Sequence, residues 1–345
     1  LIYSGGKIPL LKKAAEVKVR AKNLLTEVQE QHIISDIIET YDQLALLKQV
    51  RSVLDESERR LAENMRVADK AFSYGLITKY DRQKIEVARA RLASNIEEYE
   101  GKRGLILEKL FLLTNIPKER LELIDDGELS PIQTIQSGQS IDNRPDLRAL
   151  SAVVTAQHYR IRAEQRWRVP KAQLMGSLGY LGSYWGHLSS SKPVLPNGQK
   201  LSVDLRTLQI APLLSFGIGF SWDLFDGKEG KRQIERARID LRTAENSKAD
   251  LTEKLELNLA KCRTDYTVTL SQITIHVKQV EVAGNALDQA MHEFRTGLIR
   301  SSDLVAADED FREAKLGWCQ SVFNQRRAAI NLLMATGNLN IQSIQ

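Results

Sequence analysis

The sequence predicts a mostly α-helical protein with one transmembrane β hairpin and two internal repeats. Residues 1–123 align without a gap on residues 223–345 at a shift of 222, which indicates a repeat. No proline falls in residues 10–116 or 213–345, which favours long uninterrupted helices. Before Trp222, large apolar residues alternate with small or polar ones, which is typical of a strand.

The repeat is supported by identities spread along both copies. These pairs are Gly5 and Gly227, Ala15 and Ala237, Arg20 and Arg242, Phe72 and Phe294, Gly75 and Gly297, Asp81 and Asp303, Leu110 and Leu332, and Thr114 and Thr336. The second copy follows about 80 residues (143–222) that have no counterpart before the first copy. We therefore expect the N-terminal part of the protein to be missing from this chain.

Each copy predicts a long helix, a Gly-Leu-Ile break and a shorter helix. The long helices are expected at 7–74 and 228–296, and the short ones near 79–116 and 301–337. A helix of about 68 residues is about 100 Å long. The first long helix carries a narrow apolar stripe at spacings of three and four, as in coiled coils: Ile34, Ile37, Ile38, Tyr41, Leu44, Leu47, Leu54, Leu61, Met65 and Phe72.

Between the two hairpins the sequence predicts a connector and a separate helix. Prolines and glycines make 117–142 irregular. Asn143 can then cap a helix, with Pro145 in its first turn and Asp146 favourable to its dipole. This helix and a short hairpin arm together nearly equal one long helix in length. We expect the two to stack end to end, with the connector bulging out at their junction.

A strand hairpin is expected between Pro170 and Asp226. The second strand alternates strongly, the first (171–186) alternates more weakly, and the loop 187–206 is polar. A two-stranded hairpin is marginal alone in water, so its apolar face needs a cover, either a second sheet or lipid. The chain has too few strands for a sandwich. A large apolar face opposite a small or polar one fits a transmembrane β-barrel, which must close and therefore needs several chains.

In chain order the expected segments are the end of a strand (1–6), a helical hairpin (7–116), a connector (117–142), a helix (143–168), the β hairpin (169–226), a second helical hairpin (227–338) and a C-terminal segment (339–345).

Composition excludes little by itself. Charged residues make up 27% of the chain, the net charge is +5, and no run of 18 apolar residues predicts a membrane-spanning helix. The densest basic run comprises Arg160, Arg162, Arg166 and Arg168. It fits a solvated helix face best, and otherwise a contact with nucleic acid or lipid headgroups.

The cysteine and histidine positions predict no disulfide, metal or catalytic centre. If the second copy is a helical hairpin, Cys319 lies opposite residue 275, about 20 Å along the helix from Cys262. We therefore expect two free thiols. The five histidines have no metal-ligand spacing, and no nucleophile motif is present. We expect no enzyme, no cofactor and no metal.

Several motifs, in this order, carry a family resemblance. They are Ile2-Tyr3-Ser4-Gly5-Gly6, Tyr74-Gly75-Leu76-Ile77, Arg144-Pro145-Asp146-Leu147, Trp222-Asp223-Leu224-Phe225-Asp226-Gly227, and Phe294-Arg295-Thr296-Gly297-Leu298-Ile299 followed by Asp303-Leu304 and Asp308. With them the chain resembles the outer-membrane factor (TolC-like) family, the exit ducts of bacterial efflux pumps and type I secretion systems.

The resemblance implies an architecture and partners. A homotrimer would build a twelve-stranded β-barrel in outer-membrane lipid and a helical α-barrel in the periplasm, with the connector and C-terminus in an equatorial belt. The duct would be passive, joined by a periplasmic adaptor to an inner-membrane pump, and would bind no nucleic acid.

The resemblance also gives the helical turns a role. Alone, each glycine would end a helix in the left-handed conformation, with the apolar residues packing the turn. In the family the adaptor docks there, so exposed Leu and Ile side chains would offer it a hydrophobic knob. The expected docking residues are Gly75, Leu76, Ile77, Gly297, Leu298 and Ile299.

Two further sets of residues follow. Carboxylates after the turns suit the first turn of a helix, and in the family they line the inner end of the duct and hold its closed aperture. The expected aperture residues are Asp81, Arg300, Asp303 and Asp308. Phe294 stands where the family usually has a tyrosine. The expected lipid-facing residues are Leu214, Phe216, Ile218, Phe220 and Trp222.

The rival interpretation is a cytoplasmic coiled-coil scaffold. The strand hairpin distinguishes the two, because such a scaffold has no use for a long alternating apolar strand that ends near Trp222.

Overall fold

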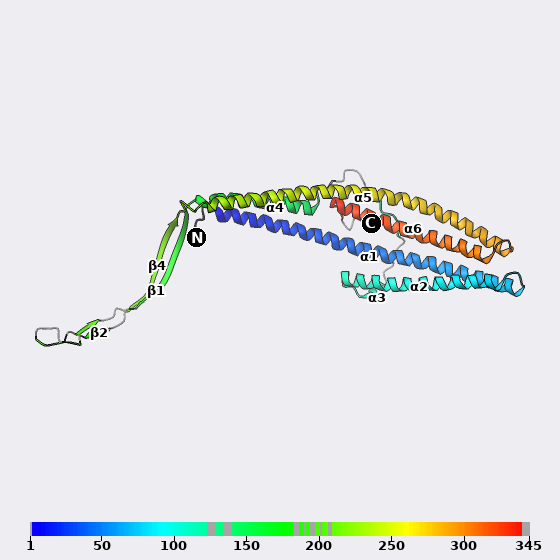
Figure 1. The fold of residues 1–345 in the computed structure, drawn as a ribbon, viewed down its shortest axis with the longest axis horizontal. Helices are drawn as coiled ribbons and strands as arrows, with labels where there is room; N and C mark the ends of the chain where they lie inside the picture. The colour runs from blue at the N-terminus through cyan, green and yellow to red at the C-terminus, as the bar shows by residue number, and fades with distance from the viewer. Residues whose placement is uncertain are drawn as a thin grey trace. The chain divides into compact units, whose positions relative to one another are not determined.

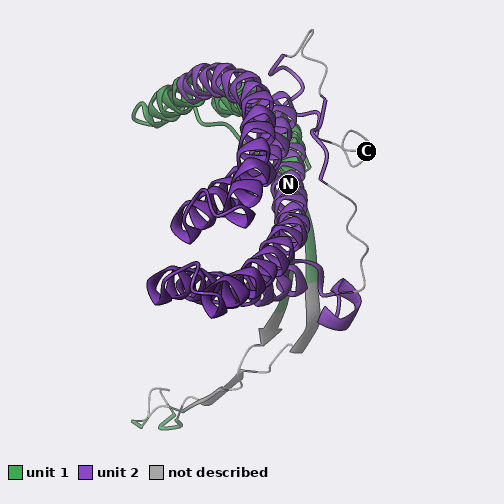
Figure 2. Cartoon of the chain, turned by 90° about the vertical axis from the view of Figure 1, so that its right-hand side faces the viewer, with its two compact units in different colours: residues 1–19, 152–245 green, residues 20–151, 246–345 purple. Residues whose placement is uncertain are grey.

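The computed structural model describes residues 2–122, 129–133, 140–182, 186–189, 191–192, 197–200, 202–205 and 209–339. The chain divides into two compact units, residues 1–19 with 152–245 and residues 20–151 with 246–345 (Figure 2). None of the helices in the described ranges combines the length and the apolar character needed to cross a bilayer.

Long helices dominate the described chain (Figure 1). They are α1 (Lys7–Ser73), α2 (Lys79–Thr114), α3 (Lys118–Leu121), α4 (Pro145–Glu164), α5 (Glu229–Arg295) and α6 (Ser301–Thr336), with a 3₁₀ turn, η1 (Gln165–Arg168), after α4. The four helices of the two hairpins begin and end within two residues of the expected positions. The helix α3 was not expected, because the connector was predicted to be irregular.

The two hairpins have the same backbone plan. Helices α1 and α5 each contain 67 residues, and α2 and α6 each contain 36. Among the described residues nine have a positive φ, and eight of these form four pairs separated by 222 positions: Gly5 and Gly227, Gly6 and Lys228, Gly75 and Gly297, and Asn115 and Gly337. Left-handed residues recur only where the backbone must turn in the same way. This recurrence supports the predicted repeat.

The strands form two antiparallel pairs. Strand β1 (Lys171–Gly182) pairs with β4 (Gln209–Ser221), and β2 (Gly186–Ser189) pairs with β3 (Ser202–Leu205). The second pair lies where the sequence predicted only a polar loop at 187–206, so that prediction was wrong. Strand β4 ends before Trp222, which the alternation had placed within it. Tyr3 forms an isolated antiparallel bridge to Ala172.

Helix α6 lies at the centre of the larger unit. Its buried apolar residues, Ala328 to Ala335, pack with Leu255, Leu259 and Tyr266 of α5. Its polar residues face α1, where the Arg326 guanidinium donates to both carboxylate oxygens of Asp42 at 2.8 and 2.9 Å. Burial raises the pKa of the Asp42 carboxyl more than Arg326 lowers it.

Side chains of α6 bind the connector, and the most buried of them is Gln325. The Gln325 amide donates to the carbonyl of Ile132 at 2.7 Å and accepts from its N–H at 2.9 Å, as a neighbouring strand would. Gln325 is fully buried. Its amide thereby satisfies backbone groups that the connector, which has no regular structure there, could not pair itself.

The end of α6 meets the start of α4. The Arg144 guanidinium donates to the carbonyl of Met334 at 3.1 Å, and a Cβ on Gly337 would lie 3.1 Å from the Arg144 Cα. Gly337 ends α6 with φ near 71°, which a side chain disfavours. The expected end-to-end stacking of these two helices is therefore present.

Both cysteines are free and buried, as the sequence predicted. Burial in apolar surroundings raises the pKa of the Cys262 and Cys319 thiols.

Candidate functional site

Both hairpin turns present a leucine side chain to solvent, and the first also exposes Tyr74. Gly75 and Gly297 are left-handed, with φ of 73° and 77°, and each ends its helix in a Schellman motif. In the first, Leu76 N–H donates to the Ala71 carbonyl at 2.9 Å. Leu76 and Leu298 are each 76% exposed. The two turns therefore expose a leucine at the same place.

The isoleucines of the turns do not share that exposure. Ile77 and Ile299 are half-buried and pack on a cluster formed by α1, α2, α5 and α6 near the turns. At the centre of this cluster Ile85 and Leu304 are fully buried. The expected knob of Leu and Ile is therefore reduced to the leucine, while the isoleucine anchors each turn.

The carboxylates after the turns cap the next helices. The Asp81 carboxylate accepts from the Thr78 N–H at 3.1 Å and from the Thr78 hydroxyl at 2.6 Å. The Asp303 carboxylate accepts from the Arg300 N–H at 3.2 Å. The hydrogen bond from the Thr78 hydroxyl is the largest of the effects that keep the pKa of Asp81 below its usual range, and the charge of Arg300 adds to them. Within the described chain Arg300 is in ion-pair range of neither aspartate.

A serine joins the two turns. The Ser301 hydroxyl donates to the Asp81 carbonyl at 2.8 Å, and it lies 3.3 Å from the Asp81 carboxylate. Ser301 is fully buried at the start of α6. Sequence reasoning did not identify it, because its counterpart in the first copy is Lys79 and nothing local marks it as a cross-link.

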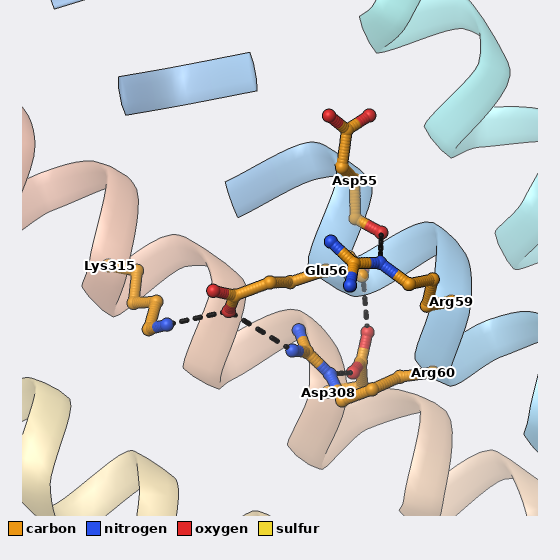
Figure 3. Close-up of polar contacts among 7 residues, drawn as sticks. Asp55, Glu56, Arg59, Arg60, Asp308 and Lys315 are labelled. Carbon is orange, nitrogen blue, oxygen red and sulfur yellow. Dashed lines mark hydrogen bonds and ion pairs between the residues drawn. The ribbon is translucent and has the colours of Figure 1, made fainter. Parts of the chain in front are cut away.

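Asp308 lies in a buried polar network (Figure 3). It is 2% exposed, and it accepts from the Arg60 Nε at 2.6 Å and from the Ser57 hydroxyl at 2.9 Å. Lys315 donates to Glu56 at 2.7 Å, and Glu56 lies 3.7 Å from Arg60. Asp308 was expected to line an aperture. Within one chain its contacts with Ser57 and Arg60 tie α6 to α1.

The sheet β1–β4 has one apolar face. Cross-strand pairs on it are Leu174 with Ile218, Gly176 with Phe216 and Leu178 with Leu214. The Phe216 ring lies over Gly176, because a Cβ there would be 3.5 Å from it. The exposed large residues of β4 on this face are Leu214, Phe216, Ile218 and Phe220, as the alternation predicted.

The other face of the sheet is mostly small or polar, and the exposed Met175 side chain on it lies over Gly219. Ser177 and Ser215 share a hydrogen bond of 2.8 Å, and Gly217 and Gly219 continue the same face of β4. Trp222, one residue beyond β4, is 60% exposed and donates from its indole to the Arg168 carbonyl at 2.8 Å. Among the described residues, no side chain covers the apolar face. The Trp222 indole holds the end of β4 at η1.

No group of three His, Cys, Asp or Glu side chains in the described ranges is arranged to hold a metal ion. The site therefore offers surfaces, namely two exposed turns and an open apolar sheet face, and a polar network that joins helices.

Several solved structures of outer-membrane channels match this arrangement. The outer-membrane channel OprN matches with a TM-score of 0.79 and 17% identity, over 97% of this chain and 72% of that one. The Campylobacter jejuni CmeC channel matches with a TM-score of 0.76 and 15% identity, over 96% and 68%. The outer-membrane protein VceC of Vibrio cholerae matches with a TM-score of 0.78 and 16% identity, over 96% and 76%. These likenesses define the fold of an outer-membrane channel.

The family model of the outer membrane efflux proteins matches residues 137–338, more than half of the chain. The chain belongs to this family of outer-membrane efflux ducts, which are not enzymes. No curated protein matches the sequence significantly. The resemblance to TolC-like ducts is therefore confirmed, and the cytoplasmic scaffold is not favoured.

Proposed function

We propose that three copies of this chain form a passive exit duct of a tripartite efflux pump or type I secretion system. Each copy contributes strands to a twelve-stranded barrel in outer-membrane lipid and two helical hairpins to an α-barrel in the periplasm. A periplasmic adaptor joins the duct to an inner-membrane pump. The observation that carries the proposal is the open apolar face of the β1–β4 sheet.

That face is suited to lipid and poorly suited to water. Phe216, Ile218 and Phe220 are 72, 65 and 79% exposed, and no described segment of the same unit covers them. A contiguous apolar patch of this kind marks an interaction surface. The opposite face, with Ser215, Gly217 and Gly219, suits the polar interior of a barrel.

The helices support assembly of several copies. Apolar side chains remain exposed along α2 and α5, including Leu105 and Leu112 on α2 and Leu257 and Val282 on α5. A long helix with exposed apolar residues is stabilised when a further helix packs on it. In the proposed trimer, these faces pack against neighbouring copies, and the two copies of the repeat alternate around the ring.

Adaptor docking rests on the turns. Leu76 and Leu298 are equivalent positions of the two copies and are equally exposed, so a trimer would present six similar leucines. We expect serine at both positions to leave folding unchanged and to weaken adaptor binding by at least about tenfold, as for loss of anchor residues. Pull-down with the purified adaptor measures this, and the half-buried Ile299 changed to Val serves as the conservative control.

The aperture rests on the link between the turns. Ser301 holds Asp81 in this chain, and Asp303 and Arg300 lie at the start of the same helix. Opening of an iris requires one hairpin to move relative to the other. We expect Asp303→Ala or Arg300→Ala to loosen this region and raise single-channel conductance in planar bilayers. Unchanged conductance for both variants would remove these residues from the aperture.

The duct itself is tested by one pair of adjacent residues on β4. Phe216→Arg places a charge on the proposed lipid face, at a cost of up to about 2–4 kcal/mol at mid-membrane, whereas Ser215→Arg places it on the proposed lumen face. We expect the first variant to reduce the yield of membrane-inserted trimer strongly and the second to reduce it little. Membrane fractionation and sizing in detergent measure both. Equal tolerance of the two arginines would contradict the barrel.

A further inference from the structure

Positive charge is concentrated in the unit that contains the sheet. Residues 1–19 and 152–245 contain 18 Lys and Arg against 9 Asp and Glu, a formal net charge of +9. The whole chain has a formal net charge of +5, so the other unit has a formal net charge of −4. A charge asymmetry of this size within one chain points to a charged partner for the basic unit.

Part of this charge gathers where the sheet meets the helices. The 3₁₀ turn η1 directly precedes β1, and the start of α5 follows β4. The two segments are in contact, since a Cβ on Gly230 would clash with the Trp167 ring. The indole of Trp222 binds the Arg168 carbonyl, which holds the end of β4 beside the same turn.

Four cations at this junction have no carboxylate within ion-pair distance among the described residues, and all four side chains are exposed. We call them the basic collar: Arg166, Arg168, Lys228 and Lys231. Neighbouring cations differ, because Lys171 pairs with Asp223 at 3.0 Å and Arg232 with Glu229 at 2.9 Å.

The nearest remaining acid is already engaged. The Asp226 carboxylate accepts from the N–H groups of Lys228 and Gly230, at 3.0 and 2.6 Å, and so caps the start of α5. Its charge is held by the backbone and directed at the helix start. The collar therefore keeps a positive charge facing solvent.

The collar is continuous with exposed apolar and aromatic side chains. Trp222, Leu224 and Phe225 lie between β4 and α5, and they are 60, 68 and 87% exposed. Aromatic side chains next to an apolar sheet face are typical of the border between hydrocarbon and headgroups. Cations at that depth attract anionic lipid. A nucleic acid would satisfy the cations and leave these apolar side chains in water.

We propose that the basic collar binds the headgroups of anionic phospholipids, of the phosphatidylglycerol class, at the membrane surface from which the sheet enters the bilayer. This inference rests on the proposed membrane insertion of the sheet. It assigns a lipid preference to the duct and a role to part of the arginine run in residues 160–168.

The test compares lipid selectivity in a reconstituted membrane. The full chain is inserted in phosphatidylcholine vesicles that carry trace spin-labelled phosphatidylglycerol or spin-labelled phosphatidylcholine. Electron paramagnetic resonance then gives the fraction of each lipid that the protein immobilises. We expect phosphatidylglycerol to associate about two- to fourfold more strongly than phosphatidylcholine, and this ratio to fall towards one at high salt.

The decisive variant replaces the four collar residues by glutamine: Arg166→Gln, Arg168→Gln, Lys228→Gln and Lys231→Gln. A matched control replaces two arginines and two lysines of the other unit that are also exposed and have no ion pair with any described residue: Arg89→Gln, Arg91→Gln, Lys109→Gln and Lys261→Gln. We expect the ratio to fall to about one in the collar variant only. Helix content by circular dichroism confirms that both variants fold.

The outcomes separate the two proposals. If even phosphatidylcholine is not immobilised, the sheet is not in the membrane and the proposed duct fails. If phosphatidylcholine is immobilised but phosphatidylglycerol is not preferred, or the collar variant keeps the preference, the lipid inference is overturned and the duct stands. Binding of the original chain and of the collar variant to a DNA duplex is measured in parallel. If the collar variant keeps the lipid preference but loses DNA binding, the collar is assigned to nucleic acid instead.

Discussion

The two helical hairpins have matching backbones and unequal surroundings. Helices α1 and α2 have the same lengths as α5 and α6, and the left-handed turns recur 222 residues apart. Yet α2 buries six of its residues, whereas α6 buries fifteen. A shared backbone plan therefore does not give two equivalent helices in the folded chain.

The difference follows from the neighbours of each helix. Helix α6 packs on α5 through an apolar cluster, on α1 through ion pairs, and under the connector through Gln325. Helix α2 packs on α1 through Leu92 and Tyr99, and it meets α6 near the turns, where Ser301 binds Asp81. Some residues of α6 are therefore enclosed although the equivalent residues of α2 are exposed to water. Charged residues at such enclosed positions need partners. Substituting repeat-equivalent residues tests this difference directly.

The largest difference is expected at Asp308 and its repeat equivalent Glu86. Asp308 is buried against Arg60, whereas Glu86 pairs at the surface with Arg82. We expect Asp308→Ala to lower the free energy of unfolding by about 3 kcal/mol, because Arg60 stays largely enclosed, loses its closest carboxylate and keeps only the longer contact of 3.7 Å with Glu56. Glu86→Ala should cost about 0.5 kcal/mol or less. Chemical denaturation of the detergent-solubilised protein, followed by circular dichroism, measures both.

The Asp308 prediction has an internal control. Replacing both partners, with Arg60→Met and Asp308→Leu, removes the enclosed charge that lost its closest carboxylate, so most of the lost stability should return. A double variant as unstable as Asp308→Ala alone would show that packing, and not the ion pair, is responsible.

A smaller difference is expected at the equivalent phenylalanines Phe294 and Phe72. Phe294 is 7% exposed within the cluster beneath the turns, whereas Phe72 is 44% exposed. We expect Phe294→Ala to lower the free energy of unfolding by about 3 kcal/mol and Phe72→Ala by about 1 kcal/mol. The same denaturation experiment applies. Equal losses would mean that assembly buries Phe72 as deeply as folding buries Phe294.

The smallest effect concerns acid and the link between the turns. The pKa of Asp81 is lower in the folded chain than its ordinary value near 4, so the unfolded state binds the proton more readily. The stabilisation by Asp81 is therefore present above that ordinary value and is lost as the pH falls through the lowered pKa. We expect faster amide hydrogen exchange at the turns below about pH 4, after correction for the intrinsic rate.

Asp81→Asn should remove this pH dependence, and Asp69→Asn serves as the control, because Asp69 pairs at the surface with Arg82 and does not contact Ser301. A pH dependence that persists in Asp81→Asn would assign the effect to another carboxylate.

The sequence predicted most of the backbone of this chain. Proline-free stretches, the glycine turns and the switch to a period of two are local signals, so they placed α1, α5, β4 and the turns before any tertiary contact was known. The sequence signal was weaker in short or polar segments. The pair β2–β3 and the helix α3 were missed, because strands and helices of four residues are stabilised by neighbours more than by their own pattern.

By itself the sequence determined the two matching hairpins, the alternating strand with its open apolar face, and the unpaired cysteines, because each depends on residues close together in the chain or on a regular period. Only the tertiary structure decided that Ile77 faces inward while Leu76 faces outward, that Ser301 joins the two turns, and that Asp308 meets Arg60. Those contacts link residues far apart in sequence. They depend on which helices lie side by side, and no local pattern encodes that choice.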